Sequence, residues 1–289
     1  MTNLQQAVKR DLAYFEIFNY HPSQEEIYRY LIGYQCPFSD LAPFVKSYPK
    51  KQVSSSLLLD KVSAANRLAV LASKFPGVRA IFLTGDLAAG SAKAGSDVDF
   101  LVVTCRGWLP VARWGLTVFF SLLGLRRSHF SLAFTKTAAC FNVFLEEYSL
   151  SMPKGRRNLF VAQEIARVKP LVDKDRYYEK LLASNSWVFD FLPNFSPSAQ
   201  PIQGVFRRSA SKNAISGPCV FAVEGLQALL SKLLLTGKPG SAGKTSLGGW
   251  AGAKQLFLHP KDLTSWVLME YKKNCQGAGV NPGKLHYET

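Results

Sequence analysis

The stretch that decides the fold runs from Phe82 to Val103 and reads FLTGDLAAGSAKAGSDVDFLVV. Apolar runs at its two ends predict two buried strands, and the small residues between them predict a glycine-rich connection. Asp97 and Asp99 are set into the start of the second strand. Alternate residues of a strand point to the same face, so both carboxylates project together while Val98 faces the other way.

The doubled aspartate has two interpretations. Two neighbouring carboxylates repel each other, which costs stability unless they share a cation. Mg²⁺ prefers oxygen ligands and is commonly held by one or two carboxylates together with substrate phosphates. We therefore interpret Asp97 and Asp99 as a metal site. The alternative is a polar strand start that only solvent caps.

The spacing around these aspartates resembles a known pattern. Gly85 and Asp86 are followed by ten residues, 87 to 96, and then by Asp97 and Asp99. This arrangement resembles the nucleotidyltransferase fold of the DNA polymerase beta superfamily, and the text LTGDLAAGSAKAGSDVDFLVVT is similar to bacterial nucleotidyltransferase-like proteins of that superfamily. The later segments NLFVAQEIARVKPLV and NSWVFDFLPN resemble those proteins as well.

The resemblance implies a role for each matching residue. Gly85 lets the backbone approach a nucleoside triphosphate, while Asp97 and Asp99 bind two Mg²⁺ ions and are the catalytic residues. These ions would align an attacking hydroxyl with the α-phosphate and neutralise the leaving pyrophosphate. Other nucleotide-binding positions implied by the resemblance are Thr84, Asp86 and Ser96, although from the sequence we expect Ser96 to favour the turn rather than to bind phosphate.

Two positions depart from the family's pattern. Asp86 stands where the family has Ser or Gly, and an acid there should repel a triphosphate. The third family carboxylate lies on a later strand, and the candidate strand CFNVFLEE offers Asn142 at its centre. Glu146 shares the parity of Asn142 but lies four residues on, roughly 13 Å at ~3.3 Å per residue, which is too far to replace it.

Other motifs carry no assigned chemistry. The segment GKPGSAGKTS lacks the first glycine of a phosphate-binding P-loop and follows a predicted helix, so Lys244 is expected in a basic loop. His259 has no His or Cys partner at metal-binding spacing and is interpreted as structural. Ser91 is expected to favour a turn, and Cys105 ends a strand.

Composition bounds the class of protein. The 289 residues, 47% of them hydrophobic, can form one large domain or two to three small ones and exclude wholesale disorder. The five cysteines (Cys36, Cys105, Cys140, Cys219 and Cys275) never form CxxC, which suggests neither a disulfide framework nor a zinc site. Reduced thiols and an N-terminus without the pattern of a signal peptide predict a cytoplasmic protein.

Charge and hydropathy bear on partners. A net charge of +15 favours polyanions such as nucleic acid, nucleotides or an anionic membrane surface, although a solvated basic surface explains it equally well. Residues 108 to 125 are strongly apolar, but Pro110 and Arg113 interrupt them. The remaining run is shorter than the ~20 residues of a membrane span, so we expect a buried helix and no span.

The predicted fold class is α+β, a small mixed-sheet nucleotidyltransferase core with helical regions on either side. The core covers 64–150, the N-terminal helical region 1–63 and the C-terminal helical region 151–289. A capping box at Ser23 and Glu26 begins the second of two helices that could form a helix-turn-helix. Expected helices cover 4–19, 24–33, 64–74, 156–168, 175–192, 220–235 and 263–274; expected strands cover 78–83, 97–104, 129–135 and 140–145.

These observations favour a Mg²⁺-dependent nucleotidyltransferase that moves a nucleoside monophosphate from a nucleoside triphosphate to an acceptor. The sequence leaves the acceptor open among nucleic acid, protein and small molecule. Asp86 and Asn142 favour a different hypothesis, an impaired member that binds nucleotide, nucleic acid or a protein. A third hypothesis is a DNA-binding regulator that uses the N-terminal helices, which salt-sensitive DNA binding would support.

Overall fold

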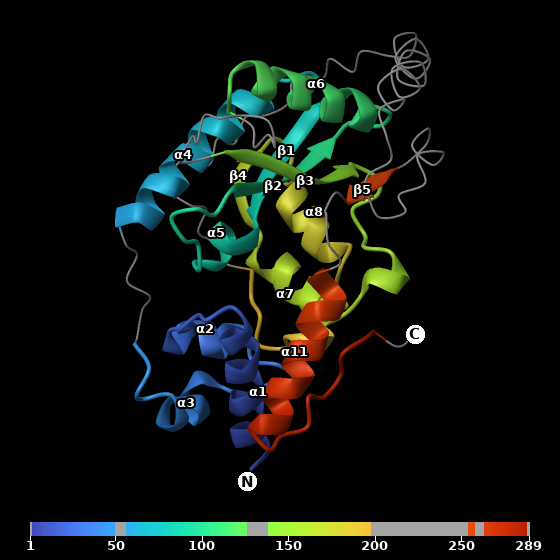
Figure 1. Ribbon diagram of the computed structural model, residues 1–289. Coiled ribbons are helices and arrows are strands. Elements are labelled where there is room, and N and C mark those ends of the chain that lie inside the picture. Colours follow the sequence, from blue (N-terminus) through green and yellow to red (C-terminus); the bar gives the residue numbers. More distant parts are fainter. Residues whose placement is uncertain (1, 50–55, 126–137, 198–253, 258–262, 288–289) are drawn as a thin grey trace, which may run out of the picture.

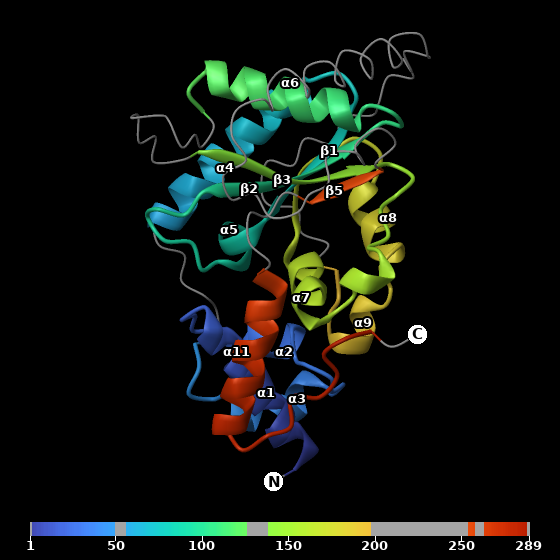
Figure 2. The same cartoon turned by 45° about the vertical axis from the view of Figure 1, so that its right-hand side comes forward.

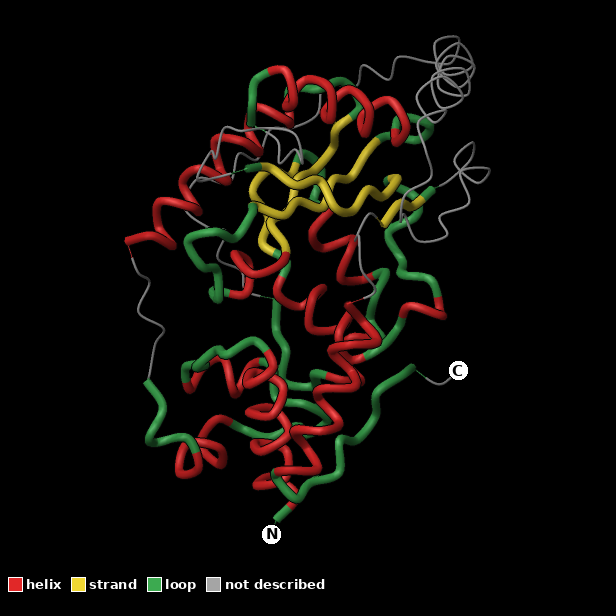
Figure 3. Tube along the Cα trace, viewed as in Figure 1, coloured by secondary structure: helices red, strands yellow, loops and turns green. Residues whose placement is uncertain are grey.

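The computed structural model describes residues 2–49, 56–125, 138–197, 254–257 and 263–287. The strand expected over 129–135 and the helix expected over 220–235 lie outside the described residues, as do Cys219, Lys244 and His259. Strands gather in one part of the molecule and helices surround them, as Figure 3 shows.

A five-stranded mixed sheet forms the centre of the molecule, in the order β4-β1-β2-β3-β5. Strand β1 runs antiparallel to β2 and β4, β2 runs parallel to β3, and β3 runs antiparallel to β5. The predicted class, a small mixed sheet flanked by helices, is confirmed. The strands are β1 (Val78–Thr84), β2 (Val98–Thr104), β3 (Ala139–Glu146), β4 (Lys169–Asp173) and β5 (Gln255–Phe257).

Two of these strands come from the part of the chain that the sequence predicts to be helical throughout, and that prediction is wrong there. Strand β4 has only five residues and β5 only three. Segments so short show no clear periodicity, and pairing with β1 and with β3 is what makes them strands. The boundaries at 63/64 and 150/151 stay a prediction.

Helices cover both faces of the sheet (Figure 2). On one face, α4 (Ser56–Ser73) and α6 (Leu109–Leu122) share an apolar core with Ile81, Phe100 and Phe144 of the sheet. On the other face, α7 (Leu159–Arg167) and α8 (Tyr177–Ala183) pack with Phe82 and Leu101. The apolar run at 108–125 forms α6, but the expected burial holds for one face only, because Val118, Phe119 and Leu122 of this helix are exposed. None of the described helices combines the length and the apolar character that crossing a bilayer requires.

The single helix predicted over 175–192 is in fact two, α8 and α9 (Val188–Phe191). Asn185, between them, is buried, and its amide donates to the backbone oxygens of Leu150 and Leu181 at 2.8 Å. Its Oδ1 accepts from the backbone N–H of Met152 at 2.7 Å. Because the Asn185 side chain is bonded to backbone groups in this way, the helix is interrupted at this residue.

Helices from the two ends of the chain, α1, α2, α3 and α11, form a second body below the sheet (Figure 1). Helix α1 (Asn3–Ile17) lies against α11 (Leu263–Gly277), with the rings of Tyr14 and Tyr271 centred 6.0 Å apart. The capping box predicted at Ser23 and Glu26 is confirmed at the start of α2. The other short helices are α2 (Gln24–Arg29), α3 (Phe38–Leu41), α5 (Gly85–Ala89) and the 3-10 turns η1 (Ala42–Phe44) and η2 (Lys154–Arg156).

Candidate functional site

Gly85 stands at the junction of β1 and α5, where only glycine fits. Its φ is +65°, a conformation that L side chains rarely adopt. An added Cβ would lie 2.5 Å from Oδ2 of Asp99. Both the backbone angle and the missing side chain therefore bring the β1–α5 turn against the Asp99 carboxylate.

The structure brings the predicted aspartates together at the start of β2. Asp99 lies opposite Thr84 of β1 and Cys140 of β3, and Asp97 directly precedes the strand. Burial raises the pKa of Asp99 to about 6, with further upward contributions from the charges of Asp97 and Asp86. The site is therefore a small, crowded set of carboxylates in which the ionised form of Asp99 is disfavoured.

Asn142 occupies the place next to Asp99. Its Nδ2 donates a hydrogen bond to Oδ1 of Asp99, and its own Oδ1 accepts from Sγ of Cys140 at 2.9 Å. Strand β3 has a register shift here, since Phe141 pairs with Phe100 and Val143 pairs with Leu101, leaving Asn142 as the extra residue. Such a bulge re-aims a side chain, and here the bulged residue bonds a site carboxylate.

The same bulge removes Glu146 from the site. The sequence predicts that Glu146 shares the face of Asn142, which is wrong, because the extra residue reverses the alternation beyond it. Phe144 packs with the α4 and α6 side of the sheet and Leu145 with the other side, so Glu146 falls on the former. Its Oε1 accepts from the backbone N–H of Gly107 at 2.6 Å.

The loop between α5 and β2 is held by its own polar groups. Oδ2 of Asp86 accepts from Oγ of Ser96 at 3.3 Å, and this oxygen of Ser96 accepts from the backbone N–H of Lys93 at 3.0 Å. Oγ of Ser91 donates to the backbone oxygen of Asp86 at 3.3 Å. The two serines hold the turn in this structure, and Asp86 lies beside the other site carboxylates.

Two residues of α7 join the site without having been singled out in the sequence. The carboxylate of Glu164 accepts from the backbone N–H of Gly85, and burial raises its pKa to about 7 against the opposing charge of Arg167. Asp99 and Asp86 raise it further. The spacing of Glu164 and Arg167, three apart on one helical face, is the signal that the sequence offers. The sequence does not show that this face of the helix points toward the turn at Gly85.

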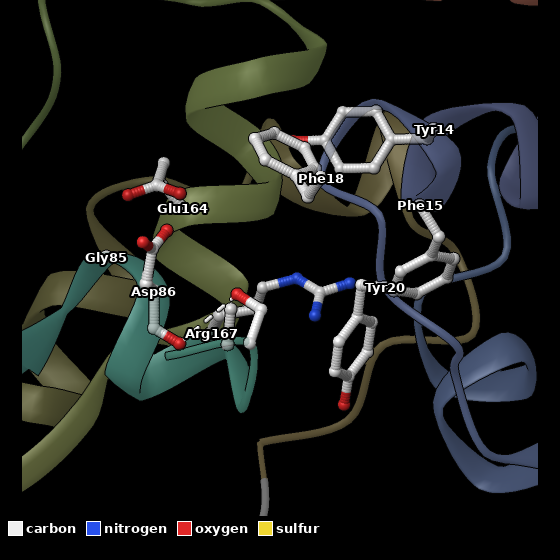
Figure 4. Close-up of a pocket in the computed structure, with 10 residues that line it drawn as sticks. Tyr14, Phe15, Phe18, Tyr20, Gly85, Asp86, Glu164 and Arg167 are labelled. Atoms are coloured by element: carbon white, nitrogen blue, oxygen red, sulfur yellow. Dashed lines mark hydrogen bonds between the residues drawn. The ribbon is translucent and has the colours of Figure 1, made fainter. Parts of the chain in front are cut away.

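A cavity joins these residues to α1, as Figure 4 shows. Gly85, Asp86 and Glu164 lie at one end, and aromatic rings from α1 and the residues after it lie at the other, with Arg167 between them. The lining residues are Tyr14, Phe15, Phe18, Tyr20, Gly85, Asp86, Ala89, Ser91, Glu164 and Arg167.

Oxygen donors suit Mg²⁺, and Asp97 and Asp99 supply them. Within the described part of the chain, no group of three or more His, Cys, Asp or Glu side chains is placed to hold a metal ion. The site thus lacks a closed protein cage. The donor set instead fits a Mg²⁺ ion that also takes ligands from substrate phosphates, the usual arrangement for this ion.

No known protein-family model and no curated protein matches the chain. Among solved structures, the chain is similar to one described as "Crystal structure of the toxin-antitoxin with AMP-PNP", with 16% sequence identity and a TM-score of 0.29. The match covers 43% of this chain and 86% of that one.

Glu164 should make the stability of the metal-free protein depend on pH. Because its pKa is raised from 4.5 to about 7, the folded protein keeps a proton that the unfolded chain loses between these values. The free energy of unfolding should therefore fall as pH rises from 4.5 to 7. We expect Glu164→Gln to reduce this fall by roughly 1 to 3 kcal/mol, since each pKa unit is worth about 1.4 kcal/mol and solvent screens part of it.

Urea unfolding in EDTA at pH 5 and pH 8 measures this effect. The exposed Glu179, which pairs with Arg176 at 3.4 Å, provides the matched control Glu179→Gln. An equal pH dependence in wild type and Glu164→Gln would show that Glu164 ionises normally in the folded protein.

Proposed function

We propose that this protein is a Mg²⁺-dependent nucleotidyltransferase that transfers a nucleoside monophosphate from a nucleoside triphosphate to an acceptor. The observation that carries the proposal is the contact between Gly85, in its left-handed conformation, and the Asp99 carboxylate, with Asp97 beside it. This contact joins the glycine of the predicted phosphate turn to the predicted metal ligands. The sequence resemblance to the polymerase beta superfamily supports the same proposal.

Each residue has a defined task under this proposal. Asp97 and Asp99 would hold Mg²⁺, which when bound supplies charge neutralisation for the triphosphate and its leaving pyrophosphate. Gly85, which has no side chain, leaves room for a phosphate group beside the turn. Glu164, whose pKa lies near neutral, is placed to accept a proton from an acceptor hydroxyl that enters the cavity.

Transfer is tested by incubating the pure protein and Mg²⁺ with each α-labelled nucleoside triphosphate and, in turn, a nucleic-acid, a protein and a small-molecule fraction of a cell extract. We expect label from at least one nucleotide on one fraction, and none when EDTA replaces Mg²⁺. Absence of label from every fraction, with nucleotide binding intact, would rule out transfer and leave the second candidate function.

That second candidate is nucleotide binding without transfer. Two observations favour it. An amide, Asn142, donates to Asp99 where the resemblance implies a third carboxylate, and the carboxylate of Glu164 accepts the Gly85 N–H. The second contact occupies the backbone N–H of Gly85, which would otherwise be available to donate a hydrogen bond to a phosphate. A protein of this kind would bind nucleotide weakly and respond to it without chemistry.

Asp86→Ser separates a disabled site from a rearranged one. Asp86 lies beside the phosphate turn and adds negative charge to Asp99 and Glu164. Because like-charge repulsion in a partly dehydrated cleft is worth on the order of 1 to 3 kcal/mol, we expect the variant to bind nucleoside triphosphate roughly 10- to 100-fold more tightly.

Nucleotide titrations of the wild type and Asp86→Ser, with Mg²⁺ and with EDTA, measure the change. Weaker binding of both Mg²⁺ and nucleotide in the variant would instead identify Asp86 as a metal ligand that compensates for Asn142. Unchanged binding would place residue 86 outside the nucleotide site.

A further inference from the structure

Helix α6 presents apolar side chains to solvent as well as to the core. Its inner face packs against the sheet with the buried residues Leu109, Ala112, Leu116 and Phe120. Its outer face has four large apolar side chains with relative exposures of 52% at Val118, 39% at Phe119, 80% at Leu122 and 50% at Leu123. A helix on the surface of a globular protein normally has polar residues on its outer face. Packing of the core therefore explains only the inner face of α6.

The four exposed side chains form one continuous patch, which we call the α6 surface. They stand at i, i+1, i+4 and i+5 along the helix and its C-cap, so they are neighbours across two turns. Single exposed apolar residues are common on proteins, whereas a contiguous apolar patch usually marks a surface that meets a partner. Figures 1 and 2 place α6 at the end of the molecule opposite α1 and α11, and neither of these helices covers it.

The charge of this part of the chain indicates the kind of partner. Between Asp99 and Glu146 the sequence contains five Lys or Arg residues and no Asp or Glu. Two of these cations, Arg106 and Arg113, stand just before α6 and within it. An apolar helical surface among cations matches an anionic membrane, because acyl chains take up the apolar residues while the headgroups attract the cations.

Helix α4 brings a further cation to the side of α6. The ring of Phe75, which follows α4, packs against Gly115 of α6, where an added Cβ would overlap it. The neighbouring Lys74 is exposed. The cations near α6 therefore come from two segments that are separate in the sequence.

The length and position of α6 suit a helix that lies along a membrane surface. Its 14 residues extend about 21 Å at 1.5 Å per residue, less than the ~30 Å of the hydrocarbon core of a bilayer. Its inner face remains packed on the sheet, so the outer face is the part that enters lipid. The candidate site is on the other face of the sheet, where Glu164 of α7 contacts Gly85. Contact with a membrane through α6 therefore leaves that site uncovered.

We propose that the α6 surface binds this protein to an anionic lipid membrane, as a peripheral contact that does not cross the bilayer. The four exposed apolar side chains enter the boundary between headgroups and acyl chains, and the surrounding cations attract anionic headgroups. The inference goes beyond the proposed function and is independent of it, because it uses neither the carboxylates nor the turn at Gly85.

Flotation with lipid vesicles tests the membrane contact. The full chain is mixed with vesicles of phosphatidylcholine alone, or of phosphatidylcholine and phosphatidylglycerol in equal parts, without nucleotide or Mg²⁺. We expect the protein to bind the anionic vesicles at least about tenfold more tightly than the neutral ones, because several cations near an anionic surface each add to the affinity. A higher salt concentration should reduce this difference, because salt screens the charges.

Leu122→Gln removes the most exposed of the four side chains and leaves the net charge and the helix propensity nearly unchanged. We expect it to weaken binding to anionic vesicles roughly tenfold, the lower end of what burial of a leucine side chain contributes. Adding Val118→Gln should increase the loss to about 100-fold. Met269→Gln is the matched control, because Met269 is 57% exposed but belongs to α11 at the opposite end of the molecule. All three variants should melt at the temperature of the wild type.

Three vesicle results overturn the inference: no binding to anionic vesicles, equal affinity for anionic and neutral vesicles, or unchanged binding when Val118→Gln and Leu122→Gln are combined. Two results without lipid also overturn it. A melting temperature that falls in Leu122→Gln but not in Met269→Gln would show that the rest of the chain covers the α6 surface. A dimer that sedimentation detects in the wild type and not in Leu122→Gln would assign the surface to a second copy of the chain.

Discussion

Asp99→Asn is expected to lower the affinity for Mn²⁺ or Mg²⁺ in the presence of nucleotide by at least about 100-fold, and transfer with it. The reason is geometric as well as electrostatic. Asp99 contacts the phosphate turn at Gly85, and its other oxygen is already bonded to Asn142. An amide at position 99 therefore removes the charge that binds the metal at the point where turn and strand meet.

The same substitution should leave the metal-free fold intact or stabilise it. Asp99 is held beside Asp97 and Asp86, and its pKa of about 6 shows that the ionised form is unfavourable in the folded protein. Asp190→Asn, the same chemical change on an exposed residue of α9, is the matched control for both metal binding and melting temperature. Full metal affinity and transfer in Asp99→Asn would refute the assignment of this residue as a metal ligand.

Gly85→Ala is expected to destabilise the protein by roughly 2 to 3 kcal/mol and to abolish Mg²⁺-dependent nucleotide binding. An L residue at a φ of +65° costs about 1 to 2 kcal/mol in the left-handed region. The added Cβ would also meet Oδ2 of Asp99 at 2.5 Å, so the carboxylate has to move away from its position beside Asn142. The free energy of unfolding and the nucleotide affinity should fall together, because both depend on the contact between Gly85 and Asp99.

Two glycines of the same chain separate the two causes. Gly124 has a φ of +66°, and no described atom lies within 4 Å of an added Cβ, so Gly124→Ala reports the backbone cost alone. At Gly95 the φ is not in the left-handed region and the space is also open, so Gly95→Ala reports neither cost. In urea unfolding and nucleotide titration, Gly85→Ala should have a lower free energy of unfolding and a lower nucleotide affinity than Gly124→Ala and Gly95→Ala. Equal stability of the Gly85 and Gly124 variants would show that Asp99 adjusts without cost.

The arrangement of turn and strand around Gly85, Asp97 and Asp99 could be predicted from the sequence because it depends on local geometry. A strand alternates with a period of two, which predicts that aspartates two residues apart share a face. In the structure Asp99 lies in β2 and Asp97 directly precedes this strand. The capping box at Ser23 and Glu26 is local in the same way, since its partners are three residues apart. Strands β1, β2 and β3 were predictable for a related reason, as each is a long run of buried apolar residues.

What only the tertiary structure decided depends on contacts between distant segments. The bulge at Asn142 arises from pairing β3 with β2, and it places Asn142 beside Asp99 while turning Glu146 to the other face. Strands β4 and β5 are too short to be recognised without their partners. The rings of Tyr14 and Phe15 lie near Arg167 because α1, from the start of the chain, packs beside α7, some 150 residues later. The contact between α1 and α7 cannot be predicted from the periodicity of either helix, because it depends on the packing of many side chains that are distant in the sequence.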